Sequence, residues 1–273
     1  KKELFGFIGP DGAGKTTLFR ILTSLLIPTN GIAKVEGFDV VKNYKEIRKI
    51  SGYMPGRFSL YFDLTVEENL NFYASIFKTS VEKNYHLIKD IYQQIEPFKK
   101  RLARNLSGGM KQKLALSCAL IHQPKVLFLD EPTTGVDAVS RKEFWEMLKS
   151  LKVKGITILV STPYMDEAML CDRVALMQKG KILSIDTPQK IIDNFGKPIL
   201  SVKTDRMYEL IYDLRDFKDT LSAFRFGQCI HYCSKLPKNE INEITEYLET
   251  KGHKNIEIEN IKPDIEDCFM DMM

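Results

Sequence analysis

The chain has 273 residues, of which 44% are hydrophobic and 28% charged, which is enough for one large domain or two modest domains with a true core. Lys and Arg exceed Asp and Glu by 40 − 36 = 4, a mild excess that argues against nucleic acid as a partner. The apolar runs fall short of the roughly 18 residues that a membrane-spanning helix needs, so we expect any membrane to be reached through a partner.

The start of the chain and its cysteines indicate what kind of chain this is and in which compartment it works. The sequence begins Lys1-Lys2-Glu3, without methionine or a signal-peptide pattern, and we expect an N-terminally truncated fragment of a longer chain. Five cysteines without a framework spacing predict free thiols in a reducing compartment. Cys229, His231 and Cys233 share one face of a predicted strand, but a metal site there is disfavoured because a fourth ligand is not evident.

The first elements predict an α/β core. Leu4–Ile8 is a short apolar run, and a loop and a helical pattern follow it. Val126–Leu129 and Ile156–Val160 are further apolar runs with helical patterns behind them, as expected for strands covered on both faces of a mainly parallel sheet. We place this core at residues 1–60 and 106–196.

Two other regions have different patterns. Residues 61–105 read as helix only, and Thr65 and Glu68 have the spacing of a capping box, so we expect a helical insert. Residues 197–273 run strand, helix, strand, strand, helix, strand. The order βαββαβ predicts a small α+β appendage of the ferredoxin-like kind.

The loop after the first strand carries the pattern G-x-x-x-x-G-K-[ST] and opens a helix. Its glycines allow successive backbone amides to face phosphate oxygens, and the helix N-terminus adds partial positive charge. We expect Lys15 to neutralise the β and γ phosphates of a nucleotide and the Thr16 hydroxyl to hold Mg²⁺. The candidate nucleotide-binding residues are Gly9, Pro10, Asp11, Gly12, Ala13, Gly14, Lys15, Thr16 and Thr17.

Two carboxylates follow the apolar run Val126–Leu129. We expect Asp130 to hold Mg²⁺ together with Thr16, and Glu131 to polarise the attacking water as the catalytic residue. Taken alone, these could be two surface acids at a strand end. The phosphate-binding loop makes the catalytic interpretation stronger.

A third motif, Leu106-Ser107-Gly108-Gly109-Met110-Lys111-Gln112, opens another helix with a serine cap and two glycines. Together the three motifs resemble the ATP-binding-cassette (ABC) ATPases, whose signature is L-S-G-G-Q; the fold implied is a P-loop NTPase (RecA-like) core. The resemblance covers about residues 4–188. Its signature residues here are Ser107, Gly108, Gly109, Met110, Lys111 and Gln112.

Further residues match the ABC family and resemble one type of exporter within it. Asp137, in Gly135-Val136-Asp137-Ala138, matches the aspartate of the loop that touches the opposite cassette. Met110, the ending Asp186-Thr187-Pro188 and the closing run Glu266–Phe269 look most like bacterial drug-export ATPases of the daunorubicin-resistance type. Such a cassette implies ATP and Mg²⁺, a second cassette bound head to tail, a membrane permease subunit, and a place on the cytoplasmic face of the membrane.

Two positions depart from the family pattern. Pro163 stands where the family has a histidine that contacts the γ-phosphate, and Gly56 stands where it has a glutamine. Neither residue offers a side-chain donor, and one lost contact to the transferring phosphate typically costs about 10²- to 10³-fold in rate. We therefore expect a slow site that lends its signature to a partner cassette, with a heterodimer or tandem fusion favoured and a homodimer kept as the alternative.

Several alternatives stay open at this point. Neighbouring residues could replace the missing contacts, or the chain could be a silent regulatory ATP-binding module or a translation-linked cassette. Chromosome and repair ATPases share the motifs, but residues 64–104 are too short for their coiled coil. The family's base-stacking aromatic lies upstream of the given chain. Trp145 falls in an amphipathic helical pattern and is expected to be a packing residue.

Overall fold

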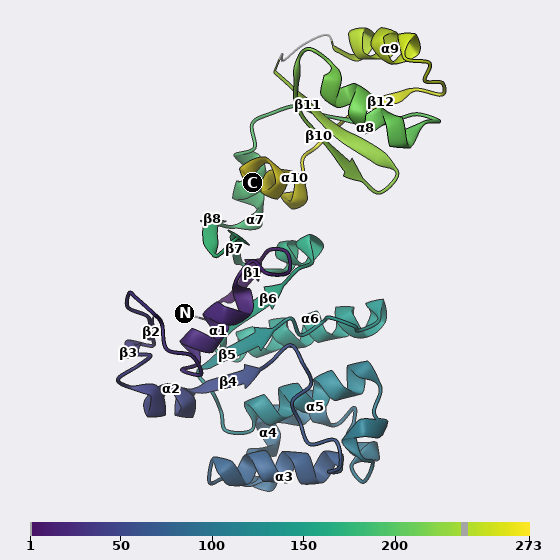
Figure 1. The fold of residues 1–273 in the computed structure, drawn as a ribbon. Helices are drawn as coiled ribbons and strands as arrows, with labels where there is room; N and C mark the ends of the chain where they lie inside the picture. The colour runs from purple at the N-terminus through teal and green to yellow at the C-terminus, as the bar shows by residue number, and fades with distance from the viewer. Residues whose placement is uncertain (1, 236–239) are drawn as a thin grey trace. The chain divides into compact units, whose positions relative to one another are not determined.

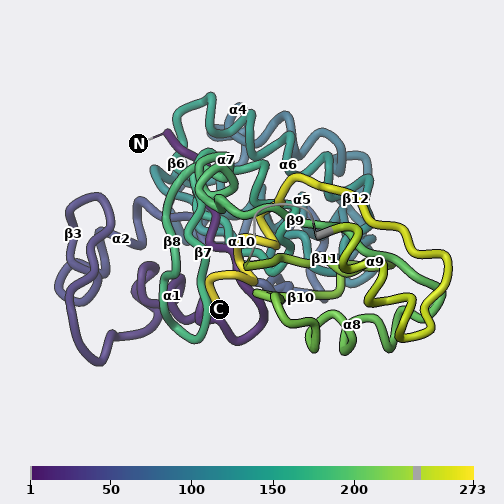
Figure 2. The backbone as a smooth tube through the Cα atoms, turned by 90° about the horizontal axis from the view of Figure 1, so that it is seen from above, coloured from purple at the N-terminus to yellow at the C-terminus, as the bar shows by residue number. Residues whose placement is uncertain are grey.

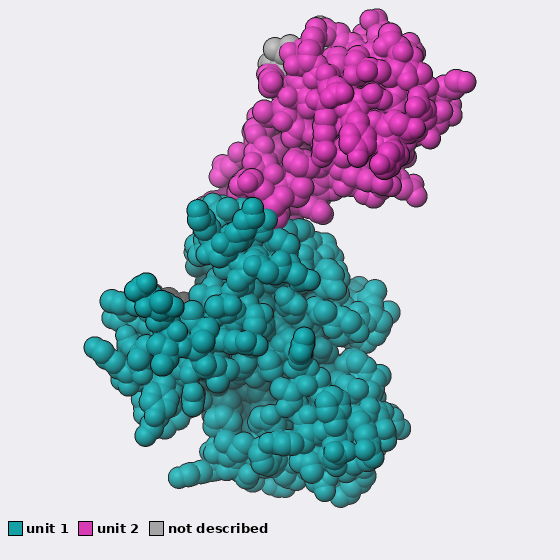
Figure 3. Space-filling view, in the orientation of Figure 1, with its two compact units in different colours: residues 1–188 teal, residues 189–273 magenta. Residues whose placement is uncertain are grey.

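The computed structural model describes residues 2–235 and 240–273 (Figure 1). Its contacts divide the chain into two units, residues 1–188 and 189–273 (Figure 3). The predicted division lay at residue 196; the difference is the short helix α7 (Pro188–Asp193). Ile191 of this helix is buried in the second unit, where its carbonyl accepts from the Cys268 thiol at 3.6 Å, so the helix packs with the appendage.

The first unit contains a six-stranded sheet in the order β4-β5-β6-β1-β7-β8. Neighbouring strands from β4 to β7 pair parallel, and β8 pairs antiparallel with β7. The carboxyl ends of β1, β4, β5 and β6 therefore meet at one edge of the sheet. The strands are β1 (Leu4–Ile8), β4 (Ser51–Met54), β5 (Val126–Asp130), β6 (Thr157–Thr162), β7 (Arg173–Gln178) and β8 (Lys181–Asp186).

Helices and a small hairpin surround this sheet. β2 (Lys34–Val35) and β3 (Phe38–Asp39) form a two-stranded sheet that lies beside α2 in both backbone views (Figures 1 and 2). The helices of the core are α1 (Lys15–Leu22), α2 (Tyr44–Ile50), α5 (Gly108–Leu120), α6 (Ala138–Val153) and the 3₁₀ helix η3 (Met165–Leu170).

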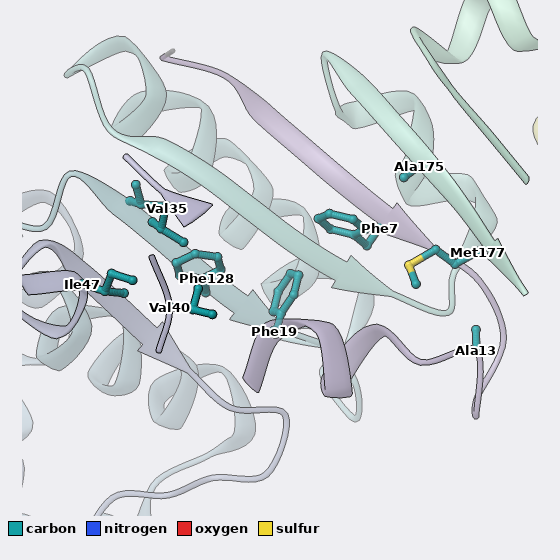
Figure 4. Packing of buried hydrophobic residues seen from close by; sticks show 10 residues of the cluster. Phe7, Ala13, Phe19, Val35, Val40, Ile47, Phe128, Ala175 and Met177 are labelled. Atoms are coloured by element: carbon teal, nitrogen blue, oxygen red, sulfur yellow. The ribbon is translucent and has the colours of Figure 1, made fainter. Parts of the chain in front are cut away.

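Aromatic packing fixes α1 against the sheet. The rings of Phe7 on β1 and Phe19 on α1 meet edge to face with centroids 5.5 Å apart, and Phe19 meets Phe128 on β5 in the same way at 5.7 Å (Figure 4). Phe19 and Phe128 are almost completely buried. Edge-to-face contacts of this kind add to the burial of apolar area and hold the start of α1 in a defined position.

The predicted helical region contains α3 (Val66–Ile76), α4 (Val81–Tyr92) and the 3₁₀ turns η1 (Glu96–Phe98) and η2 (Ala103–Asn105). The capping box at Thr65 is present: its hydroxyl accepts from the Glu68 amide at 3.2 Å, and the Glu68 carboxylate accepts from the Thr65 amide at 2.8 Å. A bridge between Thr65 and Leu102 closes the base of the region.

The second unit has the predicted order of elements. Its antiparallel sheet runs β10-β11-β9-β12, and α8 and α9 each connect two of its strands. Tyr232 and Val202 lie fully buried between this sheet and the helices. Its elements are β9 (Ile199–Lys203), α8 (Met207–Asp216), β10 (Thr220–Phe226), β11 (Cys229–Ser234), α9 (Glu240–Thr250), β12 (Glu257–Ile261) and α10 (Ile265–Met272).

Two other sequence-based expectations concern metals and membranes. Within residues 2–235 and 240–273, the His, Cys, Asp and Glu side chains form no group of three or more that could hold a metal ion. His231 instead places Nδ1 2.7 Å from a carboxylate oxygen of Asp267. In the same described ranges, every helix is too short or too polar to cross a membrane.

Candidate nucleotide-binding site

The phosphate-binding loop connects β1 to α1 in a backbone conformation that requires glycine. Gly12 and Gly14 have φ angles of 78° and 102°, in the left-handed region that other residues rarely adopt. A Cβ on Gly9 would lie 2.2 Å from the Met177 carbonyl oxygen, so the close approach of β7 excludes a side chain there. The predicted loop thus has the curled shape that exposes amides at a helix N-terminus.

Lys15 lies folded back into this loop. Only 3% of the residue is exposed, and its ammonium donates to the carbonyls of Gly9 at 2.7 Å and Pro10 at 3.0 Å. The same nitrogen lies 3.4 Å from Oε1 of Glu131. The structure therefore brings the predicted phosphate-binding lysine and the predicted catalytic carboxylate together.

The two predicted Mg²⁺ ligands also meet. The Thr16 hydroxyl donates to Oδ1 of Asp130 at 3.1 Å, and Asp130 is 2% exposed. Tyr53, on the neighbouring strand β4, places its hydroxyl beside the same carboxylate; burial and this negative charge raise the pKa of the Tyr53 hydroxyl. Hydroxyl and carboxylate oxygens are the ligands that Mg²⁺ prefers, so these residues fit that ion.

Glu131 follows β5 in an unusual backbone conformation. Its φ angle is 49°, and its amide donates to both the carbonyl oxygen and the hydroxyl of Ser161, each at 3.0 Å. Left-handed backbone at a residue other than glycine costs free energy and clusters at functional sites. Here the turn keeps the Glu131 side chain partly exposed at the carboxyl edge of the sheet, where water can reach it.

The two departures from the family pattern lie close to these acids. A Cβ built on Gly56 would lie 3.0 Å from the Asp130 carbonyl oxygen and 3.6 Å from the Glu131 Cβ. Pro163 directly follows Thr162, whose carbonyl accepts from the amide of Gly9 at 3.3 Å. Both positions thus border the phosphate-binding loop or the two carboxylates, and neither carries a side-chain donor there.

The signature occupies the exposed start of α5. The Ser107 hydroxyl caps the helix by accepting from the Met110 amide at 3.3 Å, and Ser107 and Gly108 face solvent. A Cβ on Gly109 would lie 2.7 Å from the Ser140 hydroxyl oxygen on α6. The predicted signature therefore packs closely on α6 and leaves its helix N-terminus open.

Asp137 caps α6 beside the signature. Its carboxylate accepts from the amides of Val139 at 3.1 Å and Ser140 at 3.0 Å, and the Ser140 bond is the main cause that lowers the pKa of the Asp137 carboxyl. The predicted inter-cassette residue therefore also has a role in helix stability. Because the Asp137 side chain is exposed, its carboxylate can accept further hydrogen bonds from solvent.

Comparison with known proteins identifies the family. A family model described as ABC transporter matches residues 1–134. The Nod factor export ATP-binding protein I of Rhizobium sp. (strain N33) is 31% identical over 272 residues, covering 98% of this chain and 87% of that protein. The chain belongs to the ABC transporter ATP-binding proteins.

Other relatives agree with this assignment. The probable multidrug ABC transporter ATP-binding protein YbhF of Escherichia coli (strain K12) is 49% identical over 188 residues, 68% of this chain but only 32% of that protein. The structure of cbiO1 from Clostridium perfringens, part of the ABC transporter complex cbiONQ, is 26% identical and covers 71% of this chain and 81% of that one with a TM-score of 0.64. The predicted ABC ATPase fold is confirmed.

One cluster of this ABC cassette was not predicted from the sequence. Glu167, fully buried, accepts from the Thr133 hydroxyl at 2.8 Å and from the Trp145 indole at 2.9 Å, and lies 3.2 Å from Nε of Arg141. Arg141 also pairs with Asp166. Trp145 is therefore a hydrogen-bond donor as well as a packing residue, and the cluster ties the segment after Pro163 to α6 and the loop after Glu131.

Proposed function

We propose that this ABC cassette binds Mg·ATP and powers a membrane transporter that exports drugs or other small molecules. The observation that carries the proposal is the convergence of Lys15, Thr16, Asp130 and Glu131 at one edge of the sheet. Export is supported by the printed names of the multidrug and Nod factor relatives. The narrower likeness to daunorubicin-resistance ATPases stays a prediction.

Each residue of the site has a part in this proposal. The loop amides and Lys15 bind the β and γ phosphates, Thr16 and Asp130 hold Mg²⁺, and Glu131 orients the attacking water. When bound, Mg²⁺ neutralises charge on the phosphate oxygens. Lys15 has to leave Glu131 and the two loop carbonyls to reach a phosphate, which frees Glu131 to accept a hydrogen bond from water.

The site of this chain is proposed to hydrolyse ATP slowly. Gly56 and Pro163 supply no donor near the transferring phosphate, and each missing contact typically costs about 10²- to 10³-fold in rate. The signature keeps its serine and both glycines on an open helix N-terminus. We infer that the cassette completes the site of a second, different cassette, in a heterodimer or tandem fusion.

A surface beside the signature suits the permease subunit. Tyr61 and Phe62 are 50% and 47% exposed, and the Lys111 ammonium lies 5.7 Å from the Phe62 ring and 5.8 Å from the Phe58 ring. Exposed aromatic side chains gathered in one place favour a protein partner. Because Gly56 precedes this segment and Lys111 belongs to the signature, a permease bound here would contact both ATP-related regions at the cytoplasmic face of the membrane.

The asymmetry between the two half-sites can be tested by ATP hydrolysis in the assembled transporter. Glu131→Gln removes the catalytic group of this chain's own site. Gly108→Asp places a carboxylate where the signature faces the partner's phosphate, and helix N-termini tolerate acidic residues, so folding is preserved. Gly108→Asn is the neutral control of similar size.

We expect Gly108→Asp to lower turnover at least tenfold and Glu131→Gln to lower it less than twofold, because hydrolysis occurs in the partner's site. Gly108→Asn should retain most activity. If Glu131→Gln abolishes turnover, the site of this chain is catalytic and the proposed asymmetry is wrong. If neither variant changes turnover, the chain is a regulatory module.

A further inference from the structure

Ser161 is a buried hydroxyl that contacts both predicted acids of the site. It lies near the end of β6, the strand between β5 and β1, and is 0% exposed. Its hydroxyl donates to Oδ1 of Asp130 at 2.5 Å and accepts from the Glu131 amide at 3.0 Å. One side chain on β6 therefore links the carboxylate of Asp130 to the backbone of Glu131.

The bond to Asp130 has the properties of a strong positioning contact. A short O–H···O⁻ bond in a water-excluded site is stronger than one between neutral groups. Oδ1 of Asp130 accepts a second bond, from the Thr16 hydroxyl on α1. Thr16 is itself a proposed metal ligand, whereas Ser161 only touches the carboxylate, as the hydroxyl of Tyr53 also does.

The bond from Glu131 explains how an unfavourable backbone conformation is maintained. The φ angle of 49° at Glu131 costs free energy, and the surrounding structure has to compensate for it. The Ser161 carbonyl and hydroxyl both accept from the Glu131 amide. Alanine at this position would keep the carbonyl bond and lose only the hydroxyl, so its main effect would fall on Asp130.

We propose that Ser161 is a positioning residue that orients Asp130 for Mg²⁺ binding. The inference rests on the Mg²⁺ site of the proposed function. Hydrogen-bond partners of metal-ligating groups typically change metal affinity by about 10- to 100-fold when they are removed. A hydroxyl needed only for packing or local stability would not change the metal dependence of nucleotide binding.

The experiment measures Mg²⁺ rather than turnover. The full natural chain is titrated with MgCl₂ in the presence of a fluorescent, non-hydrolysable ATP analogue, and the Mg²⁺ concentration at half-maximal enhancement of binding is compared between variants. Affinity for the analogue in EDTA is measured in parallel. Ser161→Thr keeps the hydroxyl, and Ser161→Val introduces a side chain of nearly the same shape as Thr but without the hydroxyl. Comparing these two variants therefore separates the loss of the hydrogen bond from changes in packing.

Ser117→Ala is the matched control for loss of a buried serine hydroxyl. Ser117 is also 0% exposed, and its hydroxyl donates to the Lys113 carbonyl at 2.8 Å within its own helix α5, so this bond does not involve Asp130. Thermal unfolding of every variant checks that the chain is folded at the temperature of the titration. The comparison between Thr and Val at position 161 remains decisive if Ser161→Ala is unstable.

We expect Ser161→Ala and Ser161→Val to raise the half-maximal Mg²⁺ concentration about 10- to 100-fold. Ser161→Thr and Ser117→Ala should stay within about twofold of the wild type, and affinity in EDTA should change little in all variants. If Ser161→Val and Ser161→Thr show the same Mg²⁺ dependence, the role of Ser161 is disproved while the Mg²⁺ site stands. If the wild type binds the analogue independently of Mg²⁺, the Mg²⁺ site itself is wrong, and this inference falls with it.

Discussion

The ammonium of Lys15 lies 3.4 Å from Oε1 of Glu131 and also donates to two carbonyls of its own loop. The phosphate-binding lysine is therefore neutralised by the group that is proposed to activate water. A nucleotide has to compete with this contact, because its γ-phosphate needs the same ammonium. Binding of ATP and release of Glu131 are consequently coupled at a single charge pair.

Glu131→Gln should strengthen ATP binding. The substitution removes a negative charge that attracts Lys15 and repels the γ-phosphate, and we expect about threefold to tenfold higher affinity, equivalent to about 0.7–1.4 kcal/mol. Fluorescence titration with an ATP analogue measures this affinity. Glu36→Gln is the control, since Glu36 is an exposed acid between β2 and β3, outside the phosphate-binding loop, and its charge is screened by water. Equal effects of the two variants would contradict the specific role of the Lys15–Glu131 pair.

The two signature glycines should differ in their tolerance of alanine. A Cβ on Gly109 would meet the Ser140 hydroxyl at 2.7 Å, whereas a Cβ on Gly108 has its nearest neighbour at 3.6 Å. We expect Gly109→Ala to lower the free energy of unfolding by about 1–3 kcal/mol and Gly108→Ala to change it little. Urea unfolding measures both. Adding Ser140→Gly to Gly109→Ala should restore stability; lack of rescue would show that the contact is not the cause.

Asp137 should reveal separate effects on stability and assembly. Asp137→Ala removes the cap of α6 and is expected to cost about 1 kcal/mol in unfolding free energy, while Asp137→Asn keeps the capping oxygen and should cost less. Chemical denaturation compares the two. If Asp137→Asn weakens ATP-dependent association with the partner cassette without loss of stability, the inter-cassette role is supported; unchanged association would argue against that role.

The Glu167 cluster should be important for stability. Glu167→Ala leaves the Trp145 indole without its buried acceptor, while Arg141 keeps its pair with Asp166, so we expect a cost below the about 3–5 kcal/mol of a fully buried pair. Trp145→Phe removes one hydrogen bond to a charged group and should cost about 1.5–3 kcal/mol. Denaturant unfolding of the single and double variants gives the coupling energy. Strictly additive effects would show that the indole and the carboxylate do not interact.

The sequence predicted the parts of the site that are set by local motifs. The phosphate-binding loop, the strand that delivers Asp130 and Glu131, and the cap at Thr65 each depend on residues close together in the chain, and each has the expected conformation. The order βαββαβ of the second unit was predicted for the same reason, since hydrophobic periodicity and turns report on local structure.

Contacts between segments that are distant in the sequence were harder to predict. Ser161 and Glu167 are ordinary residues in the sequence, and their roles depend on strand neighbours and on burial that one sequence does not display. Because β5 and β6 pair as neighbouring parallel strands, Ser161 lies beside Asp130 although 31 residues separate them in the sequence. The contacts divide the chain at residue 188, whereas the sequence placed the boundary at residue 196, because the place of α7 depends on packing against α10 near the end of the chain.

The slow hydrolysis proposed for this chain's site is tested by the turnover of the assembled transporter after Gly56→Gln and Pro163→His are combined. A side chain at residue 56 has to fit beside the Asp130 carbonyl, 3.0 Å from the expected Cβ, so Gly56→Ala with Pro163→Ala is the control for steric change. We expect Mg·ATP hydrolysis to rise by up to about twofold, because the partner's site already turns over, and Glu131→Gln should then remove the rise. The control should show no rise. Unchanged turnover in folded, ATP-binding protein would contradict this proposal, because the two missing donors would then not limit this site.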